Sequence, residues 1–134
     1  MDDGAVKTLF LPFENGILPF PGEGARFLFL NATPLPASDH RWQDWLECVQ
    51  GFRTDFLNLE HAGFQVEPQL SEGLFSGALV LLGKHRELNR NNIYRALERT
   101  LPGGPVLVAG AKTSGVQAMR KELVELLPIE QTLS

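Results

Sequence analysis

Cysteine is nearly absent from this sequence: Cys48 is the single cysteine among 134 residues. One cysteine excludes an internal disulfide, and it excludes any zinc site that needs two or more thiolates. This usage fits a reducing compartment. Because Cys48 alternates with Leu46 in a short strand-like run, it is expected to be a small core residue rather than a nucleophile.

Long hydrophobic runs and an excess of basic residues are also missing. No apolar stretch approaches the ~18 residues that span a bilayer, and the start Met1-Asp2-Asp3 lacks the basic residues that open a signal peptide. We therefore expect a cytoplasmic protein with no membrane partner. The net charge is −4, from 12 Lys and Arg against 16 Asp and Glu. Strong binding of nucleic acid by charge alone is not expected, although a local basic patch stays open.

Metal-ligand spacing is missing as well. The three histidines, His40, His61 and His85, are far apart in the sequence and form no ligand motif. We therefore expect no metal in this chain.

Short apolar runs alternate with helical patterns along the sequence. Continuous apolar runs, unlike alternating ones, are typical of strands buried on both faces. The alternation predicts one α/β domain over residues 1–134, with a mostly parallel, Rossmann-like sheet flanked by helices on both faces. The expected strands are Ala25–Leu30, Leu46–Gln50, Phe64–Val66, Ala78–Leu82 and Val106–Ala109.

The helices follow from apolar residues spaced three or four apart. Pro12 is expected to end the first helix. Phe52 and Leu59 are assigned to the apolar face of one later helix, and Ile93 and Leu101 to the inner stripe of another. The expected helices or helical turns are Ala5–Phe13, Ser38–Trp45, Arg53–His61, Glu87–Thr100 and Ser114–Leu127.

A nucleotide or S-adenosylmethionine site in such a sheet needs a glycine-rich turn after the first strand, where the backbone approaches the ligand. The first expected strand is followed by Asn31-Ala32-Thr33-Pro34-Leu35-Pro36, which has no glycine and two prolines without backbone donors. An acidic residue after the second strand would hold ribose hydroxyls, but Gln50 is there instead. We therefore expect no cofactor in this chain.

The loop Gly110–Gly115 superficially resembles a phosphate cradle but lacks the spacing of a P-loop. In one interpretation Thr113 or Ser114 only caps the last helix. In the other, Lys112 and this helix start also contact an anion or a partner.

A basic cluster, Lys84-His85-Arg86, follows the strand Ala78–Leu82 and is expected at the same sheet edge as Lys112. The cluster is either a solvated surface or a small patch that contacts RNA or another domain.

Several segments together resemble the N-terminal domain of the ribosomal RNA small subunit methyltransferase C family. The most specific is the strand–loop–helix Val106–Leu123, where the family has a similar G-[EAQ]-[NK]-x-x-G-[VI] pattern. The segments that carry the resemblance are LFLPFENGILPFP, ARFLFLNA, Gln50-Gly51-Phe52-Arg53, ALVLLGKHRELNRNNIYRAL and GGPVLVAGAKTSGVQAMRKEL.

The resemblance implies a non-catalytic domain that supports a second, catalytic domain and the engagement of small-subunit rRNA. Family members methylate the exocyclic N2 of a guanine, and their C-terminal domain holds S-adenosylmethionine and an Asn-Pro-Pro-type motif. That motif is absent here, so no catalytic residue is carried over. The chain stops at Thr132-Leu133-Ser134, and the family leads us to expect the catalytic domain beyond residue 134.

Two other interpretations stay open. The chain is a free-standing Rossmann-like module for binding or dimerisation, without enzymatic activity. Alternatively it is a small enzyme whose site needs a pocket with convergent polar groups.

Overall fold

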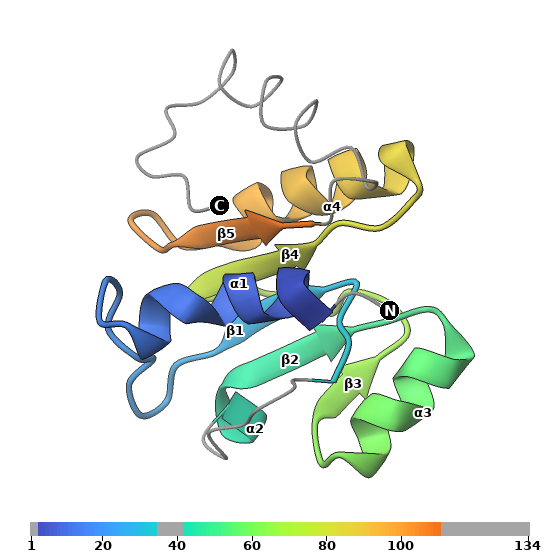
Figure 1. Ribbon diagram of the computed structural model, residues 1–134. Coiled ribbons are helices and arrows are strands. Elements are labelled where there is room, and N and C mark those ends of the chain that lie inside the picture. Colours follow the sequence, from blue (N-terminus) through green and yellow to red (C-terminus); the bar gives the residue numbers. More distant parts are fainter. Residues whose placement is uncertain (1–2, 35–41, 111–134) are drawn as a thin grey trace.

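A computed structural model describes residues 3–34 and 42–110 of the chain. These residues form a parallel sheet with helices on both faces (Figure 1). In chain order the elements are α1 (Asp3–Glu14), β1 (Phe27–Leu30), α2 (Trp42–Trp45), β2 (Leu46–Val49), α3 (Arg53–His61), β3 (Gln65–Glu67), β4 (Gly77–Leu81), α4 (Arg86–Arg99) and β5 (Val106–Ala109).

The five strands lie in the order β3-β2-β1-β4-β5, and every neighbouring pair is parallel. From β1 the chain builds outward to β2 and β3, then returns to place β4 and β5 on the other side. At the carboxyl end of β1, Leu30 is in register with Val49 of β2 and Val80 of β4. The expected Rossmann-like α/β fold is confirmed, and β1 lies where the direction of strand addition reverses.

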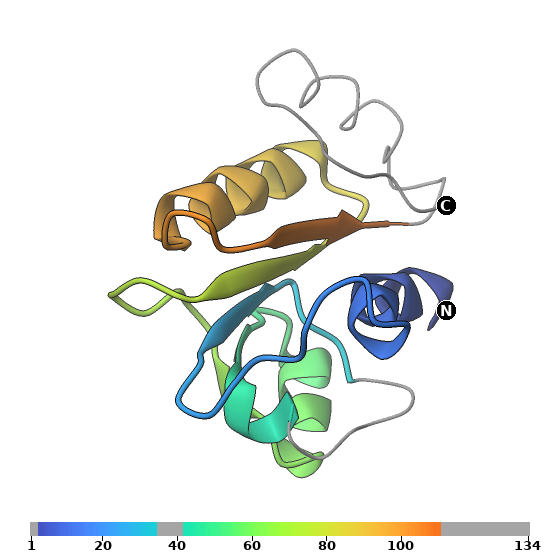
Figure 2. The ribbon, with the colours of Figure 1, turned by 90° about the vertical axis from the view of Figure 1, so that its left-hand side faces the viewer.

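The two faces of the sheet have separate hydrophobic cores, which explains why the strands are continuously apolar. Phe29 of β1 points to the face covered by α1 and α3, where it shares a core with Phe13 and Leu59. Leu28 points to the opposite face and shares a core with Ile93 of α4. Figure 2 shows α1 and α4 on opposite sides of the sheet.

Two expected apolar positions lie outside their helices and are exposed. Phe52 precedes α3 in an extended conformation, with φ −87° and ψ 120°, and 71% of its surface is accessible. Leu101 follows Thr100, which is extended at φ −94° and ψ 133°, and it is also exposed. The helical spacing therefore predicted burial wrongly for both residues. Phe52 lies before the start of α3, and Leu101 lies after the end of α4.

Two other expectations concern the end of the first helix and the position of the last one. Pro12 does not end α1, which continues to Glu14. The last expected helix, residues 114–127, lies outside the described residues. Within the described part of the chain, no helix is both long and apolar enough to cross a membrane.

Close packing between β1 and β4 gives a test of the fold. A Cβ atom on Gly77 would lie 2.6 Å from the ring of Phe27 and 3.0 Å from the carbonyl oxygen of Pro105. We predict that Gly77→Ala lowers the free energy of unfolding by ~1–3 kcal/mol, because the buried ring has to move. Urea unfolding measures this change.

The matched control is Gly22→Ala, since a Cβ on Gly22 meets no atom within 4 Å. Its free energy of unfolding should change by less than ~0.5 kcal/mol. Equal effects of the two substitutions would contradict the close approach of β1 and β4.

Candidate functional site

Ligands of open α/β sheets bind beyond the carboxyl ends of the strands, where the direction of strand addition reverses. In this chain that place is the edge beyond β1, β2 and β4. Asn31 follows β1 directly and has a positive φ of 58°, a conformation that asparagine tolerates better than most residues. Its Nδ2 donates a hydrogen bond of 2.9 Å to the carbonyl oxygen of Leu81, at the end of β4.

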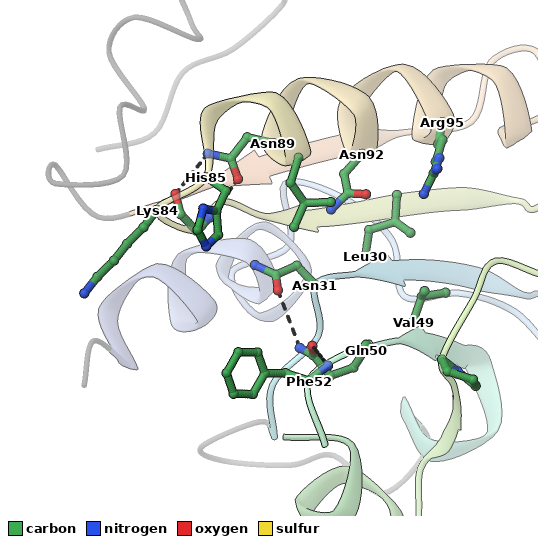
Figure 3. Close-up of a pocket in the computed structure, with 14 residues that line it drawn as sticks. Leu30, Asn31, Val49, Gln50, Phe52, Lys84, His85, Asn89, Asn92 and Arg95 are labelled. Atoms are coloured by element: carbon green, nitrogen blue, oxygen red, sulfur yellow. Dashed lines mark hydrogen bonds between the residues drawn. The ribbon is translucent and has the colours of Figure 1, made fainter. Parts of the chain in front are cut away.

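Gln50 follows β2 and is buried at the same edge. Its Nε2 donates to the carbonyl oxygen of Ala32 at 2.7 Å, with a longer contact of 3.5 Å to Oδ1 of Asn31 (Figure 3). Its Oε1 accepts a hydrogen bond of 2.8 Å from the backbone N–H of Phe52. We call the side chains of Asn31 and Gln50 the amide bridge. The bridge joins the loops after β1 and β2 to the end of β4.

The carboxylate nearest to this position in the sequence is not at the edge. Glu47 lies inside β2 and is buried, with 4% of its side chain accessible. It forms an ion pair with Arg26 and accepts a hydrogen bond from the hydroxyl of Ser71. Glu47 therefore stabilises the sheet and has no access to a ligand at the edge.

Asn89 of α4 fixes the loop after β4. Its Oδ1 accepts a hydrogen bond of 2.8 Å from the N–H of Gly83, and its Nδ2 donates one of 2.9 Å to the carbonyl oxygen of the same residue. Both backbone groups of Gly83 are thus satisfied by one side chain. A side chain at Gly83 would approach Asn31, since its Cβ would lie 3.2 Å from Nδ2.

Beside the amide bridge, a cavity of about 430 Å³ opens between α4 and the loops after β1 and β2 (Figure 3). From α4 it is lined by Leu88, Asn92 and Arg95, at positions i, i+4 and i+7 of the helix, which we call the cavity stripe. The full lining consists of Leu30, Asn31, Val49, Gln50, Gly51, Phe52, Pro68, Gly83, Lys84, His85, Leu88, Asn89, Asn92 and Arg95.

Asn92 is the buried polar group of the cavity stripe. Its side chain is 6% accessible and points from α4 toward Leu30 (Figure 3). Among the described residues none forms a hydrogen bond with its amide. The nitrogen and oxygen of this amide are not among the enclosed side-chain atoms that lack a partner, so they reach the cavity and can donate to and accept from a molecule there.

The charges around the cavity have one sign. Lys84 and Arg95 are the cations that line it, and none of its lining residues is acidic. Arg95 extends from α4 toward the strands, whereas the amine of Lys84 points away from the other labelled side chains (Figure 3). The local field therefore favours an anion, although the chain as a whole has a net charge of −4.

The structure places the expected contact residues in different ways. Lys84 and His85 lie at the predicted edge and line the cavity. Arg86 begins α4 and is exposed, but it is not part of the lining. The remaining three expected residues, Lys112, Thr113 and Ser114, lie outside the described residues.

Sequence reasoning missed Phe52, Asn92 and Arg95. Asn89 and Asn92 share a helical face with Ile93, so the spacing contained a signal for the two buried asparagines. That signal was hidden because helical periodicity is usually followed through apolar residues alone.

Cys48 lies in the core between the sheet and α1, fully buried. Burial, with a smaller effect from the charge of Glu47, raises the pKa of the Cys48 thiol from 9.0 to about 12. A neutral, enclosed thiol is a poor nucleophile, which agrees with the expected core role. In the described ranges 3–34 and 42–110, no three His, Cys, Asp or Glu side chains are grouped so as to hold a metal ion.

No model of a known protein family matches the chain, and no curated protein sequence matches it. The assignment of function therefore depends on the residues and on their arrangement at this edge.

The amide bridge gives a direct mutational test. In Gln50→Glu a carboxylate oxygen replaces the amide that donates to Ala32, so two acceptors face each other in a buried place. We predict a loss of ~2 kcal/mol in the free energy of unfolding, and no gain of S-adenosylmethionine binding despite the new acid. Chemical denaturation and calorimetric titration measure the two effects.

Gln43→Glu is the control, because Gln43 also donates to a backbone carbonyl, that of Ala62 at 2.8 Å, but in a solvent-exposed bond. Its cost should stay below ~1 kcal/mol. If both variants are equally stable, the amide bridge does not hold the edge together.

The raised pKa of Cys48 predicts a pH dependence of stability. The folded thiol keeps its proton to a higher pH than the unfolded one, so its contribution is complete below pH 9.0 and is lost as the pH rises toward about 12. Between these values the free energy of unfolding should fall by up to ~1.4 kcal/mol per pH unit more steeply in the wild type than in Cys48→Ala. Parallel pH profiles of the two proteins would refute the burial of the thiol.

Proposed function

We propose that this chain is a non-catalytic, methyltransferase-like domain of a two-domain, S-adenosylmethionine-dependent rRNA (guanine-N2) methyltransferase. In this role it supports the catalytic domain and helps to engage small-subunit rRNA in the cytoplasm. The Rossmann-like sheet and the resemblance of its segments to that family are consistent with the proposal.

One observation carries the non-catalytic part of the proposal. The position after β2, where an acid would hold ribose hydroxyls, is occupied by Gln50, and its amide already bonds to Ala32 and Phe52. The loop after β1 begins with Asn31, whose side chain bonds to the end of β4. The side chains at both positions are thus engaged within the chain, which supports a non-catalytic role.

Electrostatics also disfavours S-adenosylmethionine in the neighbouring cavity. The sulfonium centre of that cofactor is positively charged, whereas the cations Lys84 and Arg95 line the cavity without any acidic residue. The same charges favour the phosphates of an RNA backbone. We therefore propose that the chain engages rRNA through this edge of the sheet.

The proposal predicts that the chain alone binds small-subunit rRNA but transfers no methyl group to it. Radiolabelled S-adenosylmethionine measures the transfer, calorimetric titration measures cofactor binding, and filter binding measures the RNA complex. We expect no transfer, no saturable cofactor binding, and an RNA complex that weakens as salt increases.

An active S-adenosylmethionine-dependent rRNA methyltransferase in the same assay controls for the quality of the RNA and the cofactor. Turnover by these 134 residues alone would disprove the non-catalytic role. Self-association in sedimentation experiments without any RNA binding would favour the free-standing dimerisation module instead.

A further inference from the structure

We propose that the cavity binds one nucleotide of single-stranded RNA, with the base between Phe52 and the cavity stripe and the phosphate at Arg95. The inference rests on the proposed function, in which rRNA is a partner, and adds where and how the contact is made. The shared ligand chemistry is that of a nucleotide, whether in a strand or free.

The buried amide of Asn92 indicates a ligand that both donates and accepts hydrogen bonds. A phosphate or a carboxylate satisfies only the NH₂ group, because these anions accept but do not donate. The edge of a nucleobase offers donors and acceptors side by side, which an asparagine side chain matches. A base in the cavity can therefore replace solvent at this amide with a matched donor and acceptor.

Phe52 supplies an aromatic surface at the rim. Its ring is 71% accessible, while its backbone N–H is held by Oε1 of Gln50 at 2.8 Å. Leu88 of the cavity stripe is also exposed, at 45%. An exposed aromatic ring on a fixed backbone is the arrangement on which unpaired bases stack.

The size and charge of the cavity restrict the ligand further. Its volume of about 430 Å³ is within the usual range of roughly 300–1,000 Å³ for small-ligand sites, so it suits one nucleotide and not a double helix. Arg95 is three residues from Asn92 on the same helix, so an anion attached to the base meets a cation. Bases within a duplex are stacked and paired, which leaves only unpaired nucleotides able to enter.

Fluorescence anisotropy with a short, labelled single-stranded RNA tests the proposal on the full chain. We expect Phe52→Ala and Asn92→Leu each to weaken binding about tenfold, and Arg95→Ala to weaken it and to lower its salt dependence. Tyr94→Ala, an exposed aromatic residue of α4 outside the cavity, and Lys7→Ala, an exposed cation on α1, should have no effect.

Thermal unfolding of the same variants separates a binding role from a structural one. Because the amide of Asn92 is not an enclosed group without a partner, Asn92→Leu should leave the melting temperature nearly unchanged while it weakens RNA binding. A lower melting temperature together with unchanged binding would assign Asn92 to the fold and overturn the proposal.

Competitors identify the source of the ligand. Unlabelled single strands should displace the probe, whereas inorganic phosphate and the matching duplex should not. A guanosine or adenosine monophosphate that binds as tightly as the strand would overturn the assignment to RNA and identify a free nucleotide. Equal displacement by an acidic peptide would show that charge alone governs binding, and would overturn the nucleotide site.

Small-subunit rRNA binding by the same variants distinguishes the two proposals. If Phe52→Ala and Asn92→Leu bind rRNA as the wild type does, the cavity is not the contact, but the proposed function stands. If the wild type binds no RNA at all, both the cavity proposal and the RNA part of the proposed function are wrong.

Discussion

The amide bridge is the interaction on which the sheet edge depends. Gln50 donates to the loop after β1 at Ala32 and accepts from the loop after β2 at Phe52, while Asn31 bonds to the end of β4 at Leu81. These groups are at the place where the direction of strand addition reverses. The backbone N–H of Ala32 donates to the carbonyl oxygen of Val49 at 3.3 Å, and the two side-chain amides add further hydrogen bonds between the loops. The same bonds engage the side chains of Gln50 and Asn31 within the chain.

Two buried asparagines on one face of α4 have different surroundings at this edge. Asn89 uses both ends of its amide on the backbone of Gly83 and so fixes the loop after β4. Asn92, almost one turn further along, is equally buried but has no such partner among the described residues. The fold alone explains Asn89, because its amide satisfies both backbone groups of Gly83 in the loop after β4. Asn92 instead lines the cavity, and its amide is not an enclosed group without a partner, so it faces the space beside the amide bridge.

The sequence was sufficient to predict the strands and the fold class, because continuous apolar runs between amphipathic helices follow from burial of a sheet on both faces. It also placed Lys84 and His85 at the correct edge, since the carboxyl ends of parallel strands share one edge. It failed for Phe52, because the end of a helix depends on local backbone conformation that apolar spacing does not contain. It also failed for Asn89 and Asn92, whose burial depends on what the chain packs against them. The cavity itself joins segments distant in sequence, so only the folded arrangement reveals it.

The residues that follow β1 and β2 determine which chemical groups this edge of the sheet presents. Cofactor sites in related sheets depend on backbone N–H groups and glycine, which bring the main chain close to a phosphate. In this chain the loop after β1 has Asn31 and prolines there, so the available recognition groups are side chains of α4 and of the loop after β2. Asn92, Arg95 and Phe52 line the cavity that lies beside the amide bridge.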